Sequence, residues 1–478
     1  MHKQLRQPVI IISLIFISAF AISCEDDEWF GQHPPTNAQS SLGTRGQRIV
    51  DQQGRTVILR GVNYNGIESM LFTQQPPELD DFKKIKRWGF NVIRFPLSWD
   101  FIEPERDHYD EDYLRNWVEP VLNFAAQEGI GVLLDPMHQW NWSTCFFPPR
   151  GRGNGVPLWA LAPSVAAHCP YTGSDAYWRM MRAPTDFWAN TAIREKYIEM
   201  WEMMARRYGD RPEIIGYDLF NEPMPSTGPS PADFDQQVLQ PFHEELIRRI
   251  RAISPRPLII YEPVINWDLY PNYFTPMPFD RVVYSPHIYT GGTAGGLTGY
   301  NDNPAPLLTE VQKAVSEAQV QDVPVLVGEF GIGIQANYQD WIRDEFHFQE
   351  QYMVSGTWWS LRQHNNATFG LTEFDTRAEK TGLLDFVSRP YPTATAGELS
   401  AFSYDEGTKT FTMTFANSPE ASGETIISVP DYQYHGSISV QCSDPDGSWS
   451  YAYDPAESRL HVTVDPGKSV HTITVTPR

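Results

Sequence analysis

The sequence predicts an α/β protein made of a (β/α)8 barrel followed by a small C-terminal antiparallel β-sandwich. Between residues 46 and 390, eight short apolar runs alternate with long helical patterns, which is typical of repeated βα units around a parallel sheet. Several of these runs end in polar residues, which strand interiors otherwise avoid. From residue 391 to 478, short strands with period-two alternation replace the helical patterns.

The eight runs of the predicted barrel begin with apolar residues, as strands that are buried on both faces must. In such a barrel the active site lies at the C-terminal ends of the strands. We therefore expect the polar residues at those ends to converge. The runs are VILRGVNY (57–64), NVIRFPLS (91–98), GVLLDPMH (131–138), IIGYDLFNEP (214–223), LIIYEPV (258–264), VVYSPHIYT (282–290), VPVLVGEFG (323–331) and GTWWSLR (356–362).

The first 24 residues have the features of an export signal. A basic start is followed by a short apolar run that ends in Ala-Ile-Ser-Cys, which resembles a bacterial lipoprotein box with Cys24 as the acylated residue. The polar residues 25–45 are typical of a flexible tether. We expect an exported protein that is anchored to a membrane through Cys24; the alternative is ordinary cleavage and release.

Three further cysteines remain after Cys24. In an oxidising compartment we expect a disulfide between Cys145 and Cys169, with Cys442 left free. No cysteine pair has zinc-site spacing, so these residues predict no metal site.

The long segment 139–190 follows the third run and is rich in Trp, Phe, Pro and Gly. This composition argues against disorder and favours a wall or lid over the barrel mouth, although a packed excursion without function is the alternative. The formal charge of −22 repels phosphate backbones and excludes nucleic acid as a partner. The sandwich shows no clear row of surface aromatic residues, so we expect it to pack on the barrel rather than bind carbohydrate.

Two glutamates near strand ends are the candidates for catalysis. Glu222 ends the fourth run in Asn-Glu-Pro, and Glu329 lies near the end of the seventh in Gly-Glu-Phe-Gly. Strands four and seven face each other across a barrel mouth. Retaining hydrolysis of a glycosidic bond requires two carboxyl groups about 5 Å apart, one as acid/base and one as nucleophile. We assign these roles to Glu222 and Glu329, respectively.

The residues around this pair resemble those of glycoside hydrolase family 5, whose members are TIM barrels. The resemblance implies that Arg94 keeps Glu329 ionised, that Tyr289 hydrogen-bonds Glu329, and that His287 orients Glu222 or the sugar. It also implies three sugar contacts: Asn221 with the 2-hydroxyl, His138 with another hydroxyl of the same ring, and Trp358 as the floor beneath it. A metal site built from the histidines and glutamates is the alternative, but their association with Arg94 and Trp358 suits a sugar better. No cofactor is implied.

Within that family the sequence resembles the endoglycoceramidases, which cleave between the oligosaccharide and ceramide of glycosphingolipids. The similar passages are NGVPLWA (154–160), TGLLDFVSRPYPTATAG (381–397) and FSYDEGTKTFTMTF (402–415). The first contains Trp159, which we place among the substrate-binding residues together with Trp140 of the preceding segment. The sequence departs from the pattern at Trp140, where those enzymes usually have an acidic residue, and this change points to a different glycan or a single-sugar glycolipid.

Three functional hypotheses follow, all for a protein that we expect to be a monomer. The first is a retaining β-glycosidase acting on glycolipids. The second is a family 5 β-glucanase or β-glucosidase acting on soluble or polymeric glucosides. The third is a non-catalytic surface lipoprotein that binds glycans, and an intact pair of glutamates argues against it.

Overall fold

The computed structural model describes residues 41–64, 75–136, 155–167, 176–226, 228–265, 267–290, 299–362 and 369–478. Cys24, His138, Trp140, Cys145 and Cys169 lie outside these ranges, so the expected lipid anchor, disulfide and two of the sugar contacts stay predictions. Cys442 is a free cysteine, partly buried in the sandwich. Within the described ranges, no helix has the length and apolar composition to cross a membrane.

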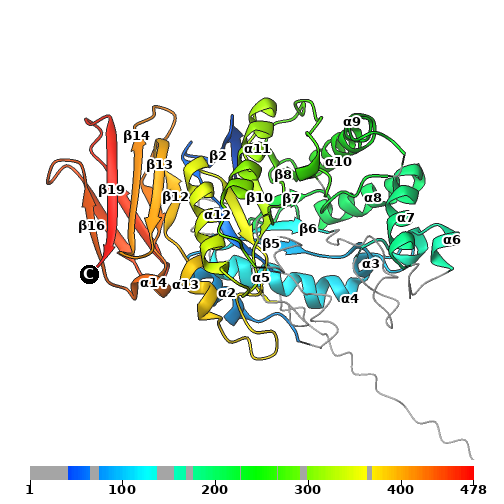
Figure 1. Cartoon of the computed structure of the whole chain (residues 1–478), viewed down its shortest axis with the longest axis horizontal. Coiled ribbons are helices and arrows are strands. Elements are labelled where there is room, and N and C mark those ends of the chain that lie inside the picture. Colours follow the sequence, from blue (N-terminus) through cyan, green and yellow to red (C-terminus); the bar gives the residue numbers. More distant parts are fainter. Residues whose placement is uncertain are drawn as a thin grey trace, which may run out of the picture. The chain divides into compact units, whose positions relative to one another are not determined.

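An eight-stranded parallel sheet forms the barrel, in the order β10-β11-β4-β5-β6-β7-β8-β9 (Figure 1). Parallel bridges between Tyr284 and Val325 and between Ile288 and Phe330 join the last strand to the first, so the sheet closes. All eight predicted runs contain one of these strands. They are β4 (Arg60–Asn63), β5 (Val92–Pro96), β6 (Gly131–Asp135), β7 (Ile214–Asp218), β8 (Leu258–Tyr261), β9 (Val282–Tyr284), β10 (Leu326–Phe330) and β11 (Ser355–Trp358).

Helices surround the barrel and bury their apolar faces against it. Helix α8 is an example: the side chain of Asn190 caps its first turn, and Tyr197 and Trp201 are fully buried on its inner face. The main helices are α2 (Leu79–Arg87), α3 (Trp99–Ile102), α4 (Glu111–Tyr113), α5 (Glu119–Glu128), α6 (Pro163–Ala166), α7 (Ala176–Ala189), α8 (Thr191–Tyr208), α9 (Pro231–Phe234), α10 (Gln240–Arg251), α11 (Ala305–Gln321), α12 (Tyr338–Tyr352) and α13 (Thr381–Val387).

Two antiparallel sheets form the sandwich, as predicted. One has four strands in the order β13-β14-β19-β16, and the other has seven in the order β1-β2-β3-β12-β15-β18-β17. Phe411, Met413, Phe415 and Ile473 lie in the fully buried core between them. The strands are β12 (Tyr391–Thr395), β13 (Glu398–Asp405), β14 (Thr410–Ala416), β15 (Thr425–Ser428), β16 (Ile438–Cys442), β17 (Ser450–Asp454), β18 (Arg459–Thr463) and β19 (Val470–Pro477), with the short helix α14 (Asp431–Tyr434) between β15 and β16.

The seven-stranded sheet includes three strands from the beginning of the described chain. These are β1 (Gly43–Arg45), β2 (Arg48–Val50) and β3 (Thr56–Val57). Strand β3 pairs with β12, where Val57 lies opposite Ala394. The sequence predicts a flexible tether up to residue 45 and the barrel domain from residue 46, whereas residues 43–45 form strand β1 and this sheet joins residues 43–57 to strands of the sandwich.

Buried charges connect the barrel helices to the sandwich. Glu350 of α12 accepts hydrogen bonds from the Arg389 guanidinium at 3.1 Å and from the backbone N–H of Tyr404 at 3.2 Å. Arg60 of β4 lies 3.6 Å from the same carboxylate. All three charged side chains are at most 4 % exposed. Figure 1 shows α12 beside strands β12 and β13.

Candidate active site

The C-terminal ends of the barrel strands bring Glu222 and Glu329 together. Glu329 lies in β10, and Glu222 follows β7 with a left-handed backbone at φ 43°. A carboxylate oxygen of each glutamate and a ring nitrogen of His287 lie within 4.8 Å of one another. Inverting glycosidases separate their carboxyl groups by about 6.5–9.5 Å to admit a water, whereas retaining enzymes hold them about 5–5.5 Å apart. The close approach of these oxygens agrees with the retaining arrangement.

Two donors surround the carboxylate of Glu329, which is 5 % exposed. Arg94 Nη1 donates to its Oε1 at 2.9 Å, and the Tyr289 hydroxyl donates to its Oε2 at 2.7 Å. Both predicted contacts are therefore confirmed. Hydrogen bonds to a carboxylate, together with a nearby positive charge, favour its ionised form, which is the form that a nucleophile needs.

The carboxyl group of Glu222 has a different environment. Its Oε1 lies 2.9 Å from Nδ1 of His287, the predicted partner. Burial raises the pKa of Glu222, and the charge of Glu329 adds to that rise, while the hydrogen bond from His287 opposes it. Glu222 thus retains its proton to higher pH than an ordinary glutamate, which is the property of a general acid.

His287 lies between carboxylates on both sides of its ring. Nδ1 faces Glu222, and Nε2 lies 3.2 Å from Oε1 of Glu262. Burial alone would lower the pKa of His287, but the negative charges of Glu262 and Glu329 outweigh it and raise that pKa well above the usual value. The ring therefore carries a positive charge at neutral pH.

Every nitrogen of the Arg94 guanidinium contacts another residue of the site. It is fully buried and pairs with four carboxylates, those of Asp135, Asp218, Glu262 and Glu329, at 2.7–3.0 Å. Burial raises the pKa of Asp218 well above the usual value, and although Arg94 opposes this, the neighbouring charges of Glu262 and Asp135 add to it. A carboxyl group that keeps its proton to higher pH reduces the excess of negative charge that this cluster buries.

The amide of Asn221 is oriented by Arg94, whose Nη2 donates to its oxygen at 2.9 Å. This contact identifies the oxygen of the amide, and the expected bond to a sugar 2-hydroxyl would come from the amide nitrogen. That bond stays a prediction.

Sequence reasoning missed Glu262, Asp218, Asp135 and Asn63 as members of the site. The Asn63 amide donates to the backbone of β10 and β11 and accepts from Arg94 of β5, so it links its own strand β4 to three others. Each of these four residues lies at or directly after the end of a barrel strand. The feature that identified Glu222, a polar residue at the end of a strand, is therefore present at all four positions. It is clearest in Tyr-Glu-Pro at 261–263.

The expected role of Trp358 as the floor of a sugar site is wrong. Its side chain is fully buried, packs edge to face with Phe330 and Trp341, and donates its indole N–H to the Phe369 carbonyl. Successive side chains of a strand point to opposite faces. Phe330 therefore points away from the side of Glu329, and Trp358 packs against Phe330, whereas Trp359, which follows the last residue of β11, is partly exposed.

The described contacts of Trp159 do not include the two glutamates. Its ring packs at right angles to Trp99, and its indole N–H donates to the Glu103 carbonyl at 2.8 Å. It lies in the short helical turn Leu158–Ala160, within the long segment after β6. Its contact with substrate stays a prediction.

A metal site at Glu222, His287 and Glu329 is a poor fit to the hydrogen bonding. Both oxygens of Glu329 accept from Arg94 and Tyr289, and the His287 nitrogen that faces Glu222 carries a proton when the ring is charged. A metal-bound histidine must instead be neutral at its ligating nitrogen.

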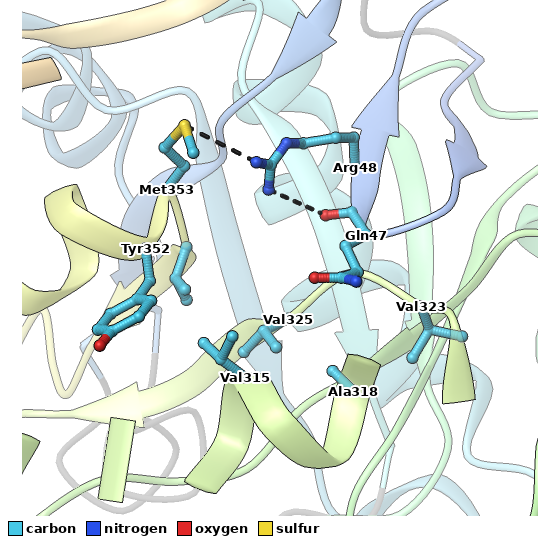
Figure 2. Close-up of a pocket in the computed structure, with 9 residues that line it drawn as sticks. Gln47, Arg48, Val315, Ala318, Val323, Val325, Tyr352 and Met353 are labelled. Atoms are coloured by element: carbon cyan, nitrogen blue, oxygen red, sulfur yellow. Dashed lines mark hydrogen bonds between the residues drawn. The ribbon is translucent and has the colours of Figure 1, made fainter. Parts of the chain in front are cut away.

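A pocket in Figure 2 lies elsewhere on the barrel. It is lined by Gln47, Arg48, Val315, Ala318, Val323, Val325, Tyr352, Met353 and Val354. Val323 and Val325 precede the first residue of β10, whereas Glu329 lies near the last, so this pocket is at the opposite end of the strands from the site. Arg48 lies against Met353 there, at 3.8 Å from its sulfur.

Two family models match the chain. One, described as Cellulase (glycosyl hydrolase family 5), matches residues 50–365. The other, described as Glycoside hydrolase family 5 C-terminal domain, matches residues 389–475. Together they cover the barrel and most of the sandwich.

Individual proteins match over most of their length. Endoglycoceramidase I of Rhodococcus hoagii is 27 % identical over 437 residues, which cover 85 % of this chain and 83 % of the relative. An endoglucanase of Paenibacillus polymyxa is 26 % identical over 369 residues, which cover 69 % and 81 %. The solved structure of endo-glycoceramidase II from Rhodococcus sp. as a lactosyl-enzyme intermediate superimposes with a TM-score of 0.75 at 25 % identity, and covers 90 % of this chain and 99 % of that one.

Proposed function

This chain belongs to glycoside hydrolase family 5, and from that membership we propose that it is a retaining β-glycosidase that cleaves between sugar and lipid in glycosphingolipids. The single observation that supports retention is the close approach of Glu222 and Glu329, within 4.8 Å. The covalent intermediate named for the endo-glycoceramidase II structure agrees with it.

The reaction proceeds in two steps. Glu329 attacks the anomeric carbon while Glu222 gives its proton to the glycosidic oxygen, so the bond to the aglycone breaks and a glycosyl ester forms. Glu222, now a carboxylate, removes a proton from water as that water attacks the same carbon. The ester breaks, the sugar leaves with its original configuration, and both glutamates return to their starting states.

The lipid substrate is supported by similarity rather than by the catalytic pair, which any retaining enzyme of this family shares. The similarity to an endoglycoceramidase extends over 85 % of the chain, and the sandwich matches the family 5 C-terminal domain. The match to an endoglucanase covers 69 % of the chain and keeps a soluble or polymeric glucoside as the second candidate. We propose Trp359 as the sugar floor in place of Trp358.

The test is a side-by-side hydrolysis of three substrates by the purified protein, with the products resolved by mass. The substrates are a detergent-dispersed glycosphingolipid, a simple glucosyl lipid and a soluble cello-oligosaccharide. We expect release of intact oligosaccharide and ceramide. Glucose from the glucosyl lipid alone would make the enzyme a glucolipid glucosidase, and turnover of the soluble sugar alone would overturn the lipid substrate.

We also propose that the protein is exported and anchored to a membrane by acylation of Cys24, acting there as a monomer. The support is the apolar run and the Ala-Ile-Ser-Cys sequence that ends at Cys24. Cys24→Ser should move the protein from the membrane fraction to the soluble fraction of an expressing bacterium. An unchanged distribution would contradict the anchor and leave the enzymatic proposal unaffected.

A further inference from the structure

We propose that Glu262, a third glutamate at the barrel mouth, is a positioning residue that fixes Glu222 for both of its proton transfers. Glu262 follows strand β8 and is 2 % exposed. The inference rests on the acid/base role given to Glu222 in the proposed function. It does not depend on whether the aglycone is a lipid.

The first contact of Glu262 is with the backbone of Glu222. Its Oε2 accepts the Glu222 backbone N–H at 2.6 Å. Glu222 has a left-handed backbone, which L-residues other than glycine, asparagine and aspartate seldom adopt without local support. A charge-assisted hydrogen bond to that N–H therefore holds the acid/base residue in the conformation that directs its side chain into the site.

The second oxygen of Glu262 joins both halves of the catalytic pair. Oε1 accepts from Arg94 Nη2 at 2.9 Å, and Arg94 in turn binds Glu329. The same oxygen lies 3.2 Å from His287 Nε2, while the other nitrogen of that ring lies 2.9 Å from Glu222. One carboxylate thus contacts the Glu222 backbone, the partner of the Glu222 side chain, and the partner of the nucleophile.

The negative charge on Glu262 favours the protonated form of His287, in which the ring can donate a hydrogen bond to Glu222. Both ring nitrogens face carboxylate oxygens, and both can donate only when the ring is protonated. The charged groups around Glu262 come from several elements. Its direct neighbours are Arg94 of β5, Asp218 at the end of β7, Glu222 after β7 and His287 after β9. Arg94 connects it to Asp135 of β6 and Glu329 of β10. Among them Glu262 contributes most to the positive charge on His287, whose pKa burial would otherwise lower.

A charged His287 lets Glu222 change its protonation state between the two steps. In the first step burial and the charge of Glu329 keep Glu222 protonated. Once Glu329 has become an ester that charge is gone, and the imidazolium stabilises the carboxylate form of Glu222, which must then act as base. A neutral ring with the other tautomer provides no donor to Glu222.

The test compares leaving groups in the Glu262→Gln variant. A 2,4-dinitrophenyl glycoside departs without a proton, whereas an alkyl glycoside requires one. With both aglycones on the glycan that the unmodified enzyme hydrolyses, we expect kcat/KM for the alkyl glycoside to fall by about 10- to 100-fold and that for the dinitrophenyl glycoside to change by less than about threefold. Azide, which attacks without a base, should accelerate deglycosylation in this variant.

Three further variants make the outcome decisive. Glu345→Gln is the matched control, because Glu345 is a fully buried glutamate that accepts from Gln349 on the same outer helix, α12. It should leave both rates unchanged. Glu262→Asp keeps the charge and should retain more alkyl-glycoside activity than Glu262→Gln. It also serves as the second probe should the glutamine variant fold poorly by circular dichroism.

The Glu222→Gln variant shows how the rates for the two leaving groups change when the acid/base residue itself is removed. If Glu222→Gln shows no dependence on the leaving group, the acid/base assignment itself fails. If Glu222→Gln shows it but the Glu262 variants lower both rates equally, or neither rate, Glu262 is only a structural residue and the inference is overturned.

Discussion

At the residue scale, the effect of one hydrogen bond to the nucleophile Glu329 on the reaction rate can be measured. Tyr289→Phe removes the hydroxyl that donates to Glu329 at 2.7 Å and keeps the ring. Because a hydrogen bond to a charged group contributes about 1.5–3 kcal/mol, we expect kcat/KM to fall by about 10- to 100-fold with little change in stability. Tyr284→Phe is the matched control, since that hydroxyl donates at the same distance to Glu317; an equal loss there would remove the special role of Tyr289.

The raised pKa of Glu222 predicts the basic limb of the pH profile. The acid form of Glu222 is the active form, so kcat/KM for an alkyl glycoside should stay high up to the raised pKa and fall as the pH rises through it. With a dinitrophenyl glycoside, Glu222→Gln should remove that limb in kcat/KM, because no proton is donated. A basic limb that persists in this variant would belong to another group.

At this scale, the sequence predicted the site residues that met two conditions: a position near the end of a strand, and a side chain with a known role in glycoside hydrolysis. Glu222, Glu329, Arg94, His287 and Tyr289 met both conditions, and their mutual contacts followed. Glu262 met only the first, because a single strand-end carboxylate gives no indication of its partners. Trp358 and Trp359 are adjacent, and only the strand register determines which one faces the mouth.

Strand β10 illustrates a constraint at the scale of the element. A methyl group at Gly328 would lie 2.8 Å from His287 Nε2 and 2.7 Å from the Ser285 hydroxyl. Gly328→Ala should therefore displace the His287 ring and lower kcat/KM by about 100-fold, since a misplacement of about 1 Å has that effect. Gly43→Ala, whose added methyl would lie 3.9 Å from its nearest neighbour, is the control and should retain full activity.

The barrel strands were predictable because each lies in a compact run between helical patterns, and most of these runs are apolar. Strands β1 to β3 were not, because they have only two or three residues each and mixed polarity, as in Gly-Thr-Arg at 43–45. Pairing with β12, far along the chain, stabilises them. Their structure is thus set by tertiary contacts that a local pattern does not encode.

At the scale of the whole molecule, Glu350 links the barrel to the sandwich. Glu350→Ala leaves the buried Arg60 and Arg389 without this carboxylate, so we expect the free energy of unfolding to fall by about 3–5 kcal/mol. Chemical denaturation measures the change. Glu424→Ala removes a largely exposed glutamate of the same protein and should change it by less than about 1 kcal/mol; comparable losses would mean that the interface charge contributes little.

Removal of the sandwich should also affect the barrel. A chain that ends at residue 390 loses strand β12, which pairs with β3, and the sandwich residues that cluster with Ile58. We expect this truncated protein to be insoluble or to unfold well below the temperature of the complete one, and the complete protein to unfold in one calorimetric transition. Two separate transitions would show that barrel and sandwich are independent folding units.

The shared sheet of β1–β3 and β12 also affects when the protein can complete its fold during synthesis. A ribosome delivers Val57 long before Ala394, so strands β1–β3 can pair only with one another until almost the whole barrel has been synthesised. Contacts between such distant segments form late and slow the search for the native state. The seven-stranded sheet therefore cannot be completed until the last strands of the chain have left the ribosome.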